Sequence, residues 1–224
     1  MRRFVEGLDA IPEALRGGAL TIGNFDGVHR GHREIVRAAR AWAREMGAPV
    51  TAMTFEPSPD RILNPEHAVQ RILPHGVRLQ RLLEAGCDGV ISVCPDRCLL
   101  GQKPEEFAER VVIGRFAARY VVEGWGFRFG RGRAGDVDTL AEIGRELGFT
   151  VQAVEPVTEV IDGEAERISS TMIRRLVDEG RVEEAGRCLG RDFALFGRIE
   201  PGEGKGRLLD FPTANIDPGE QVCP

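Results

Sequence analysis

The fold of this chain is decided by one stretch, Ala19-Leu20-Thr21-Ile22-Gly23-Asn24-Phe25-Asp26-Gly27-Val28-His29-Arg30-Gly31-His32. Its apolar beginning, residues 19–22, predicts a strand, and the glycine-punctuated turn behind it leads into an amphipathic helix over residues 32–46. Glycines let backbone N–H groups approach a ligand closely, and the N-terminus of a helix attracts anions. His29 and His32 stand at this turn, where each imidazole could donate a hydrogen bond to phosphate. The stretch therefore predicts a phosphate-binding strand–turn–helix unit.

Two other interpretations of this turn are open. The histidines could merely cap the helix, or Asp26, His29 and His32 could hold a metal ion. The metal site is the weaker alternative, because the sequence offers no further cluster of ligands. Four polar side chains fall within nine positions and are interleaved with glycines, and this density favours phosphate binding.

The rest of the chain alternates between predicted strands and helices. Strands are expected at 19–22, 49–55, 89–93, 119–123 and 150–154, and helices at 32–46, 77–85, 103–119 and 137–147. A rigid loop is expected at 56–59, and an edge strand at 193–199. The alternation predicts an α/β domain whose parallel sheet is covered on both faces. Ligands of such sheets bind at the carboxyl ends of the strands, so the loops after Ile22, Phe55 and Glu123 should share one edge.

Composition excludes several classes of protein. The chain has 224 residues, of which 42% are hydrophobic and 29% charged, as in an ordinary globular protein with one sizeable domain and a small second one. A net charge of −5 argues against a nucleic-acid partner. No apolar run approaches a membrane span, and no secretory signal follows the first arginines, so we expect a cytoplasmic protein with no membrane partner. The oligomeric state is not indicated.

The five cysteines have no framework spacing. Cys94 and Cys98, with Cys87 nearby, do not complete a set of four metal ligands. We therefore expect reduced thiols rather than a metal centre or disulfides.

A second constellation is Arg167-Ile168-Ser169-Ser170-Thr171-Met172-Ile173-Arg174. Serine and threonine at a helix start are common N-caps. Hydroxyls beside the free N–H groups of a helix start, with Arg174 one turn on, also form an anion cradle. Paired with the loop at 23–32, this segment predicts the other side of a phosphate site.

A third constellation is the glycine-rich loop over residues 124–133, in which aromatic residues and arginines alternate. Its aromatic rings could stack on a planar ligand, and its arginines could meet phosphates. The alternative is a mobile basic loop without a ligand.

Five segments in this order resemble the bacterial bifunctional riboflavin kinase/FAD synthetases. They are the loop at 23–32, Phe55-Glu56-Pro57, Phe127-Arg128-Phe129-Gly130, Ile168-Ser169-Ser170-Thr171-Met172-Ile173-Arg174 and Phe211-Pro212-Thr213-Ala214-Asn215. The resemblance implies a Rossmann-like nucleotidyltransferase domain at residues 1–187, followed at 188–224 by the incomplete start of a riboflavin kinase β-barrel. It also implies transfer of AMP from ATP to FMN, which gives FAD and pyrophosphate, in a family that also phosphorylates riboflavin to FMN.

The same resemblance implies roles for individual residues. His29, His32 and Arg174 would be catalytic, the histidines holding the ATP phosphates as pyrophosphate leaves. The nucleotide site would be lined by Gly23, Asn24, Phe25 and Asp26, the phosphate tail held by Ser169, Ser170, Thr171 and Arg174, and the flavin held by Phe55, Pro57, Phe127 and Arg128. Mg²⁺ is expected on the ATP oxygens, held largely by phosphates and water. In the kinase segment, Thr213 and Asn215 match residues that hold Mg²⁺-ATP.

The chain departs from the family pattern at two positions. Gly126 stands where the family has Asp or Asn, which bears on ligand affinity more than on the fold. Asp210 stands where the family has glycine and is strained if that position requires a left-handed φ.

The kinase segment stops at Pro224, before the rest of the barrel and its catalytic glutamate, so we expect no riboflavin phosphorylation from these residues. Either the sequence is a fragment of a longer enzyme or the kinase has been lost. The tail after residue 191 is too short for a core of its own and either docks on the first domain or begins something longer. Two functional alternatives are another cytidylyl- or adenylyltransferase, and a flavin- or nucleotide-binding remnant without turnover.

Overall fold

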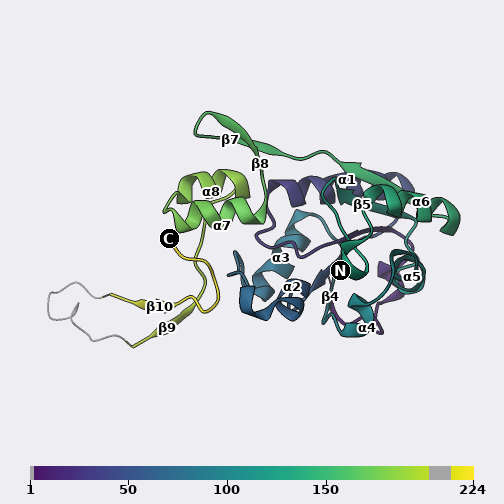
Figure 1. Cartoon of the computed structure of the whole chain (residues 1–224), viewed down its shortest axis with the longest axis horizontal. Coiled ribbons are helices and arrows are strands. Elements are labelled where there is room, and N and C mark those ends of the chain that lie inside the picture. Colours follow the sequence, from purple (N-terminus) through teal and green to yellow (C-terminus); the bar gives the residue numbers. More distant parts are fainter. Residues whose placement is uncertain (1–2, 202–212) are drawn as a thin grey trace.

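A six-stranded parallel sheet organises the molecule, as the alternating pattern predicted (Figure 1). The computed structural model describes residues 3–201 and 213–224. In spatial order the strands are β1 (Arg3–Glu6), β4 (Gly89–Val93), β3 (Val50–Phe55), β2 (Ala19–Ile22), β5 (Tyr120–Gly124) and β6 (Thr150–Val154). β1 is an addition to the prediction. It is short and its side chains are mostly exposed, so no apolar run signals it.

The order of the strands reverses beside β2. From β2 the chain steps outward through β3 to β4, and then crosses back to place β5 on the other side of β2. In register, Ala19 faces both Val50 of β3 and Tyr120 of β5. In open α/β sheets, such a switch point leaves a crevice at the carboxyl ends of the strands, which is where ligands bind.

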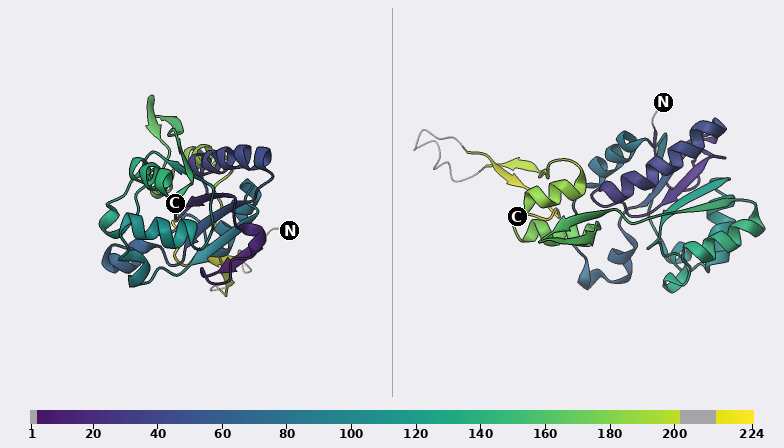
Figure 2. Two further views of the ribbon diagram at one scale, coloured as in Figure 1. Left: turned by 90° about the vertical axis from the view of Figure 1, so that its right-hand side faces the viewer. Right: turned by 90° about the horizontal axis from the view of Figure 1, so that it is seen from above.

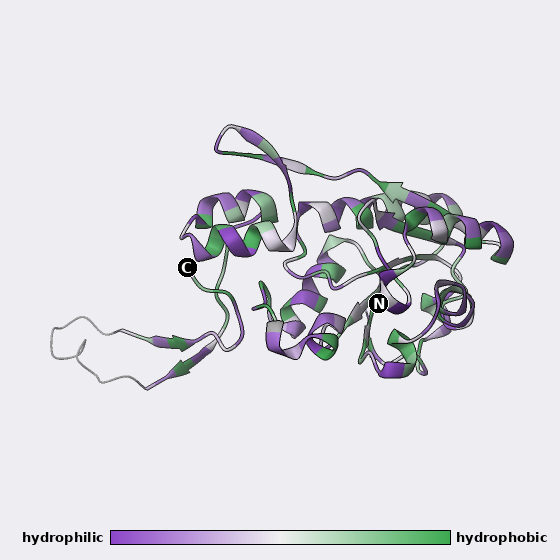
Figure 3. Ribbon diagram, in the orientation of Figure 1, coloured by the Kyte–Doolittle hydropathy of each residue, from purple (hydrophilic) through white to green (hydrophobic). Residues whose placement is uncertain are grey.

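Helices cover both faces of the sheet. α1 (Arg30–Met46) and α3 (His75–Ala85) pack on one face, and α6 (Val137–Leu147) packs on the other. Neighbouring residues in a strand therefore enter different cores: Val90 packs with α1 and α3, whereas Ile91 packs with α6. The helices carry alternating hydrophilic and hydrophobic residues, as expected for elements with one buried face (Figure 3).

The predicted helix at 103–119 is broken into two pieces. α5 (Pro104–Phe107) runs into a wider π-helical segment, η3 (Ala108–Ile113), which ends with the N–H of Gly114 donating to the carbonyl of Glu109. The φ of 47° at Ala117 then turns the chain into β5. The apolar spacing indicated a helix but did not distinguish the two hydrogen-bonding patterns.

Short helical turns occupy several connections. Where a rigid loop was predicted after β3, the chain forms α2 (Pro59–Leu63) from the second proline onward, because a proline is well accommodated in the first turn of a helix. The remaining turns are η1 (Glu13–Leu15), η2 (Pro65–His67), α4 (Arg97–Leu100) and η4 (Arg131–Arg133).

The last third of the chain adds a hairpin and two helices. β7 (Thr158–Ile161) and β8 (Glu164–Arg167) pair antiparallel, and α7 (Ser170–Asp178) and α8 (Val182–Leu189) pack against each other beside the sheet (Figure 1). Within the described residues, no helix combines the length and the apolar character needed to cross a bilayer.

The described part of the tail, residues 192–201 and 213–224, packs in part on the core that contains α1 and α3 and in part projects from the molecule. Phe193 and Phe196 pack against that core, and the N–H of Phe196 donates to the side chain of Gln221 instead of to a neighbouring strand. The predicted strand at 193–199 is therefore wrong for most of its length. Only from Arg198 does a strand form, β9 (Arg198–Glu200), paired antiparallel with β10 (Asn215–Asp217).

The β9–β10 hairpin points away from the body of the molecule and exposes apolar side chains (Figures 2 and 3). The predictions for Asp210 and for Phe211 and Pro212 lie outside the described residues.

Leu176 tests the packing of α7, because its side chain is fully buried. We expect Leu176→Ala to lower the free energy of unfolding by about 2–5 kcal/mol through lost burial and a residual cavity. Leu63→Ala, at a leucine that is 63% exposed, should cost less than about 0.5 kcal/mol. Urea unfolding followed by circular dichroism measures both changes, and equal losses would contradict the assignment of Leu176 to the core.

Candidate active site

A cavity of about 390 Å³ opens at the carboxyl ends of β2 and β5, at the switch point of the sheet. Its walls come from the turn after β2, the loop after β5, the end of β6 and the start of α7. Among the predicted site residues, it is lined by Gly23, Phe25, His29, His32, Phe127, Ser169 and Ser170. The structure thus brings the first and second constellations together with part of the third.

The turn after β2 has an unusual backbone. Phe25, Gly27 and Val28 adopt left-handed φ values of 48°, 84° and 41°. Only glycine takes such values freely, so Phe25 and Val28 are strained and must be held by their surroundings. Gly31 is tightly packed as well, since a Cβ there would lie 3.1 Å from the ring of His29. The turn therefore depends on contacts from other segments.

Asp26 supplies the strongest of these contacts. Its buried carboxylate accepts hydrogen bonds from the N–H groups of Ile72 at 3.0 Å and Leu73 at 3.2 Å. The guanidinium of Arg174 on α7 pairs with the same carboxylate at 2.6 Å. Neither Asp26 nor Arg174 lines the cavity. The structure pairs these two predicted ligands with each other, as a brace between the turn and α7.

The N-termini of two helices line the cavity. His29 is the N-cap of α1, and its Nδ1 accepts from the N–H of His32 at 3.4 Å. Ser169 is the N-cap of α7, and its Oγ accepts from the N–H of Met172 at 3.1 Å. The Oγ of Ser170 donates to the carbonyl of Asp26 at 2.8 Å and so joins the two starts. Two positive helix poles at one cavity favour an anionic ligand.

The imidazoles of His29 and His32 are stacked, with ring centroids 3.6 Å apart and planes inclined by 19°. Burial lowers the pKa of His29 to about 3, with further lowering from the charges of Arg167 and Arg191. Burial, and then the neighbouring His29, hold the pKa of His32 well below its usual range. Both rings are thus neutral near pH 7. Because the Nδ1 of His29 accepts a hydrogen bond, its proton lies on Nε2, which is a donor.

Arg167 and Glu123 are cavity residues that the sequence did not single out as ligands. Arg167 ends β8 and is close enough to His29 to lower its pKa. Glu123, on β5, is only 2% exposed and accepts from the N–H of Ile22 at 2.6 Å. Burial raises the pKa of this carboxyl well above its usual range. A lone charged residue at a strand end is too common a signal to identify either one.

The loop after β5 supplies an aromatic wall. Trp125 and Phe127 line the cavity, and Phe127 stacks on Phe129 with centroids 5.5 Å apart. Gly126 lies between them, and a Cβ there would be 2.6 Å from the guanidinium of Arg167. The space of the side chain missing at Gly126 is therefore taken by a cation.

Other predicted residues lie outside this cavity lining. They are Asn24, Thr171, Phe55, Pro57, Arg128, Thr213 and Asn215. Asn24, Thr171, Thr213 and Asn215 are exposed, and Arg128 pairs with Asp136 at 3.1 Å. Phe55 ends β3, on the same edge of the sheet as the cavity.

The alternative of a metal held by Asp26, His29 and His32 finds no support in this geometry. Asp26 is turned toward Ile72 and Arg174, away from the imidazoles. Across the described part of the chain, no group of three or more His, Cys, Asp or Glu side chains is arranged to hold a metal ion.

Two family models match this chain. The FAD synthetase model matches residues 11–172, and the riboflavin kinase model matches residues 189–224. The chain is 34% identical over 223 residues to the bifunctional riboflavin kinase/FMN adenylyltransferase of Escherichia coli (strain K12), covering 99% of this chain and 70% of that protein. It is 36% identical over 217 residues to the protein of the same description from Pseudomonas fluorescens, covering 96% and 67%.

A solved structure has the same fold over nearly the whole chain. It is a crystal structure described as a macrolide-efflux protein from Streptococcus pneumoniae, with a TM-score of 0.87 and 27% identity. The match covers 99% of this chain and 71% of that one.

Asp26→Asn tests the brace below the turn. The asparagine cannot balance the charge of Arg174, so we expect the free energy of unfolding to fall by about 3–5 kcal/mol. Glu34→Gln, which breaks an exposed pair with Arg37 on α1, should leave stability nearly unchanged. Chemical denaturation measures both, and an unperturbed Asp26→Asn protein would contradict the bracing role.

The neutral imidazoles predict how stability depends on pH. The unfolded chain binds a proton at His29 below about pH 6.5, whereas the folded chain does not until about pH 3. The unfolded state therefore binds more protons in this window, and stability falls as the pH falls through it. Between pH 8 and pH 5 the contribution of His29 amounts to about 2 kcal/mol. Denaturation of wild type and His29→Gln at both pH values measures it, and an unchanged pH slope in the variant would refute it.

Proposed function

The chain belongs to the family of bifunctional riboflavin kinase/FMN adenylyltransferases, with an FMN adenylyltransferase module that serves FAD biosynthesis, and we propose that the cavity between β2 and β5 is where AMP passes from ATP to FMN. The observation that carries this proposal is the convergence of two helix N-termini and two stacked imidazoles on one cavity. A triphosphate is the ligand that this arrangement suits.

The reaction needs positioning more than covalent chemistry. An oxygen of the FMN phosphate forms a bond to the α-phosphorus of ATP, while the bond from that phosphorus to the bridging oxygen of pyrophosphate breaks. FAD and pyrophosphate are the products. Two polyanions must be brought together, so the protein contributes alignment and stabilisation of the charge that develops on the leaving group.

His29 and His32 are proposed to serve the leaving pyrophosphate. A neutral imidazole has one N–H to donate, and that of His29 is on Nε2 because its Nδ1 caps the helix. Phosphate oxygens close to these rings favour the protonated form, so negative charge raises the imidazole pKa and strengthens the hydrogen bonds. Ser169 and Ser170 would receive the phosphates from the N-terminus of α7.

Arg167 is proposed as a cation for the phosphates in place of Arg174. It lines the cavity, whereas Arg174 is occupied by Asp26. Arg174 would then act on the site through the turn that it braces. The backbone of Gly23, which also lines the cavity, would lie against the nucleotide.

The flavin is proposed to lie toward the aromatic wall and the neighbouring strand end. Trp125 and Phe127 offer faces on which a planar ring can stack. Phe55 ends β3 and Pro57 follows it at the same edge of the sheet, and both stay predictions for the flavin side together with Arg128. Gly126 leaves this wall without a polar side chain, so binding there rests on stacking and on Arg167.

Mg²⁺ is part of the proposal as a companion of ATP rather than a resident of the protein. The described residues offer no cluster of acidic or imidazole ligands for it, so the phosphates and water would hold it. Bound there, it would neutralise part of the phosphate charge. Asp26 is excluded from this task, because Arg174 and two backbone N–H groups already engage its carboxylate.

The kinase segment is proposed to begin at residue 188, in the last turn of α8. The two family models support this division, since one ends at residue 172 and the other begins at 189. Thr213 and Asn215 stay predictions as the Mg²⁺-ATP residues of that segment. A cytoplasmic location, with small-molecule partners such as ATP, FMN and riboflavin, stays a prediction as well.

The direct test is to incubate the purified chain with FMN, ATP and Mg²⁺ and to separate the flavins by chromatography. FAD together with an equal amount of pyrophosphate is the expected result. Binding of FMN or ATP without FAD would indicate a binding remnant. Another adenylylated or cytidylylated product from a panel of phosphate acceptors would indicate a different transferase.

His32→Ala tests the catalytic assignment. The variant loses a hydrogen-bond donor to the developing charge, and we expect FAD formation to fall by ~10²-fold or more. The fold should be kept, because His32 is neutral and its Nδ1 has no partner in the structure. Initial rates, with thermal unfolding as the control, decide the matter. Wild-type rates in a folded variant would remove His32 from the mechanism.

A further inference from the structure

Gln221, near the end of the described tail, is buried although it is polar. Its side-chain amide makes three hydrogen bonds. Nε2 donates to the carbonyls of Ile72 at 3.0 Å and Ala194 at 2.7 Å, and Oε1 accepts from the N–H of Phe196 at 2.9 Å. A fully satisfied buried amide of this kind fixes the geometry of the segments it joins.

One of those segments is the support of the active-site turn. The carbonyl of Ile72 accepts from Gln221, and the N–H of the same residue donates to the carboxylate of Asp26. Ile72 therefore links Gln221 of the tail directly to the Asp26 carboxylate, which braces the turn. Because Phe25 and Val28 hold strained φ values, the position of that brace decides where His29 and His32 stand.

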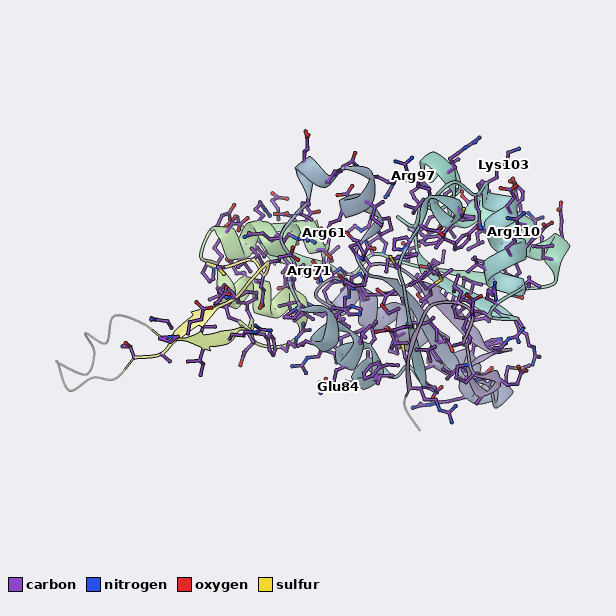
Figure 4. The ribbon with its side chains drawn as sticks, turned by 90° about the horizontal axis from the view of Figure 1, so that it is seen from below. Arg61, Arg71, Glu84, Arg97, Lys103 and Arg110 are labelled. Carbon is purple, nitrogen blue, oxygen red and sulfur yellow. The ribbon has the colours of Figure 1, made fainter. Side chains whose placement is uncertain are left out.

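The tail is held against this segment on both sides of Gln221. The N–H of Arg71 donates to the carbonyl of Glu220 at 2.8 Å, and the N–H of Val222 donates to the carbonyl of Arg71 at 2.7 Å. Arg61 and Arg71, which lie side by side beside the tail (Figure 4), both pair with the carboxylate of Glu220. Gln221 thus forms an isolated parallel bridge with Arg71.

We propose that Gln221 is a positioning residue for adenylyl transfer, acting through Ile72 and Asp26 on the turn that carries His29 and His32. The inference rests on the proposed function of the cavity. It assigns to the tail, in the part matched by the riboflavin kinase model, a role in the site of the other module. Removal of the tail should therefore impair the first module, although none of the described tail residues lines the cavity.

The test compares Gln221→Leu with Val222→Ala. Leucine fills the space but removes the hydrogen bond to Ile72, whereas Val222→Ala loosens the same buried tail and leaves that bond intact. We expect Gln221→Leu to lower kcat/KM for ATP by about 10-fold or more, since small misplacements of catalytic groups have effects of this size. Val222→Ala, assayed well below its Tm, should stay within about twofold of wild type.

Two further variants serve as controls for the effect of Gln221→Leu. Gln221→Asn keeps the amide but shortens its reach, and it replaces Gln221→Leu if the latter does not fold. Asp26→Asn combined with Gln221→Leu should be no worse than Asp26→Asn alone, because both changes act on one brace. Wild-type kcat/KM in Gln221→Leu, or an equal loss in Val222→Ala, would overturn the proposal.

The affinity for ATP separates this inference from the proposed function. Calorimetric titration of each variant with ATP and Mg²⁺ needs no turnover. If the wild-type chain makes no FAD, the proposed reaction fails. A weaker affinity in Gln221→Leu but not in Val222→Ala would still support the positioning role, and equal affinities would refute it.

Discussion

The carboxylate of Asp26 is the contact on which the site depends. It takes hydrogen bonds from two successive N–H groups, at Ile72 and Leu73, and it neutralises Arg174. Together with hydrogen bonds from Ser170 and Arg191 to carbonyls of the turn, it holds a turn with two strained non-glycine residues in shape. This turn determines where α1 begins, and a hydrogen bond from Ser170 links it to α7. One buried charge thus holds together segments that are far apart in the sequence.

Much of this arrangement could be predicted from the sequence. The alternation of apolar runs and amphipathic segments gave the parallel sheet, and the loops after Ile22 and Glu123 do meet at one edge, because parallel strands end on the same side. His29, His32, Ser169 and Ser170 share one cavity as expected. These successes rest on periodicity and on local turn chemistry, which a sequence displays directly.

The rest depends on partners that a sequence does not display. In a sequence, a carboxylate and a guanidinium both suggest ligands, whether they contact a substrate or each other. The pairing of Asp26 with Arg174 could therefore not be predicted. Arg167 opens the segment at 167–174 that was predicted to hold phosphate, but the sequence does not show that Arg167, rather than Arg174, faces the cavity. Gln221 is a single amide in a polar tail, and its burial follows only from the docking of that tail. In each case, the spatial neighbours of the residue, rather than its type, determine its role.

The stacked, neutral imidazoles have a consequence for ligand binding itself. The histidines are uncharged in the empty cavity, and the charge of a phosphate beside them raises their pKa, so the site takes up hydrogen ions with its ligand only at pH values below the raised pKa. The protons taken up from solvent neutralise part of the phosphate charge. The apparent affinity for the ligand therefore weakens as the pH rises. Departure of the phosphates returns those hydrogen ions. The heat of binding would accordingly vary with the ionisation enthalpy of the buffer, which gives the cavity a calorimetric signature of its own.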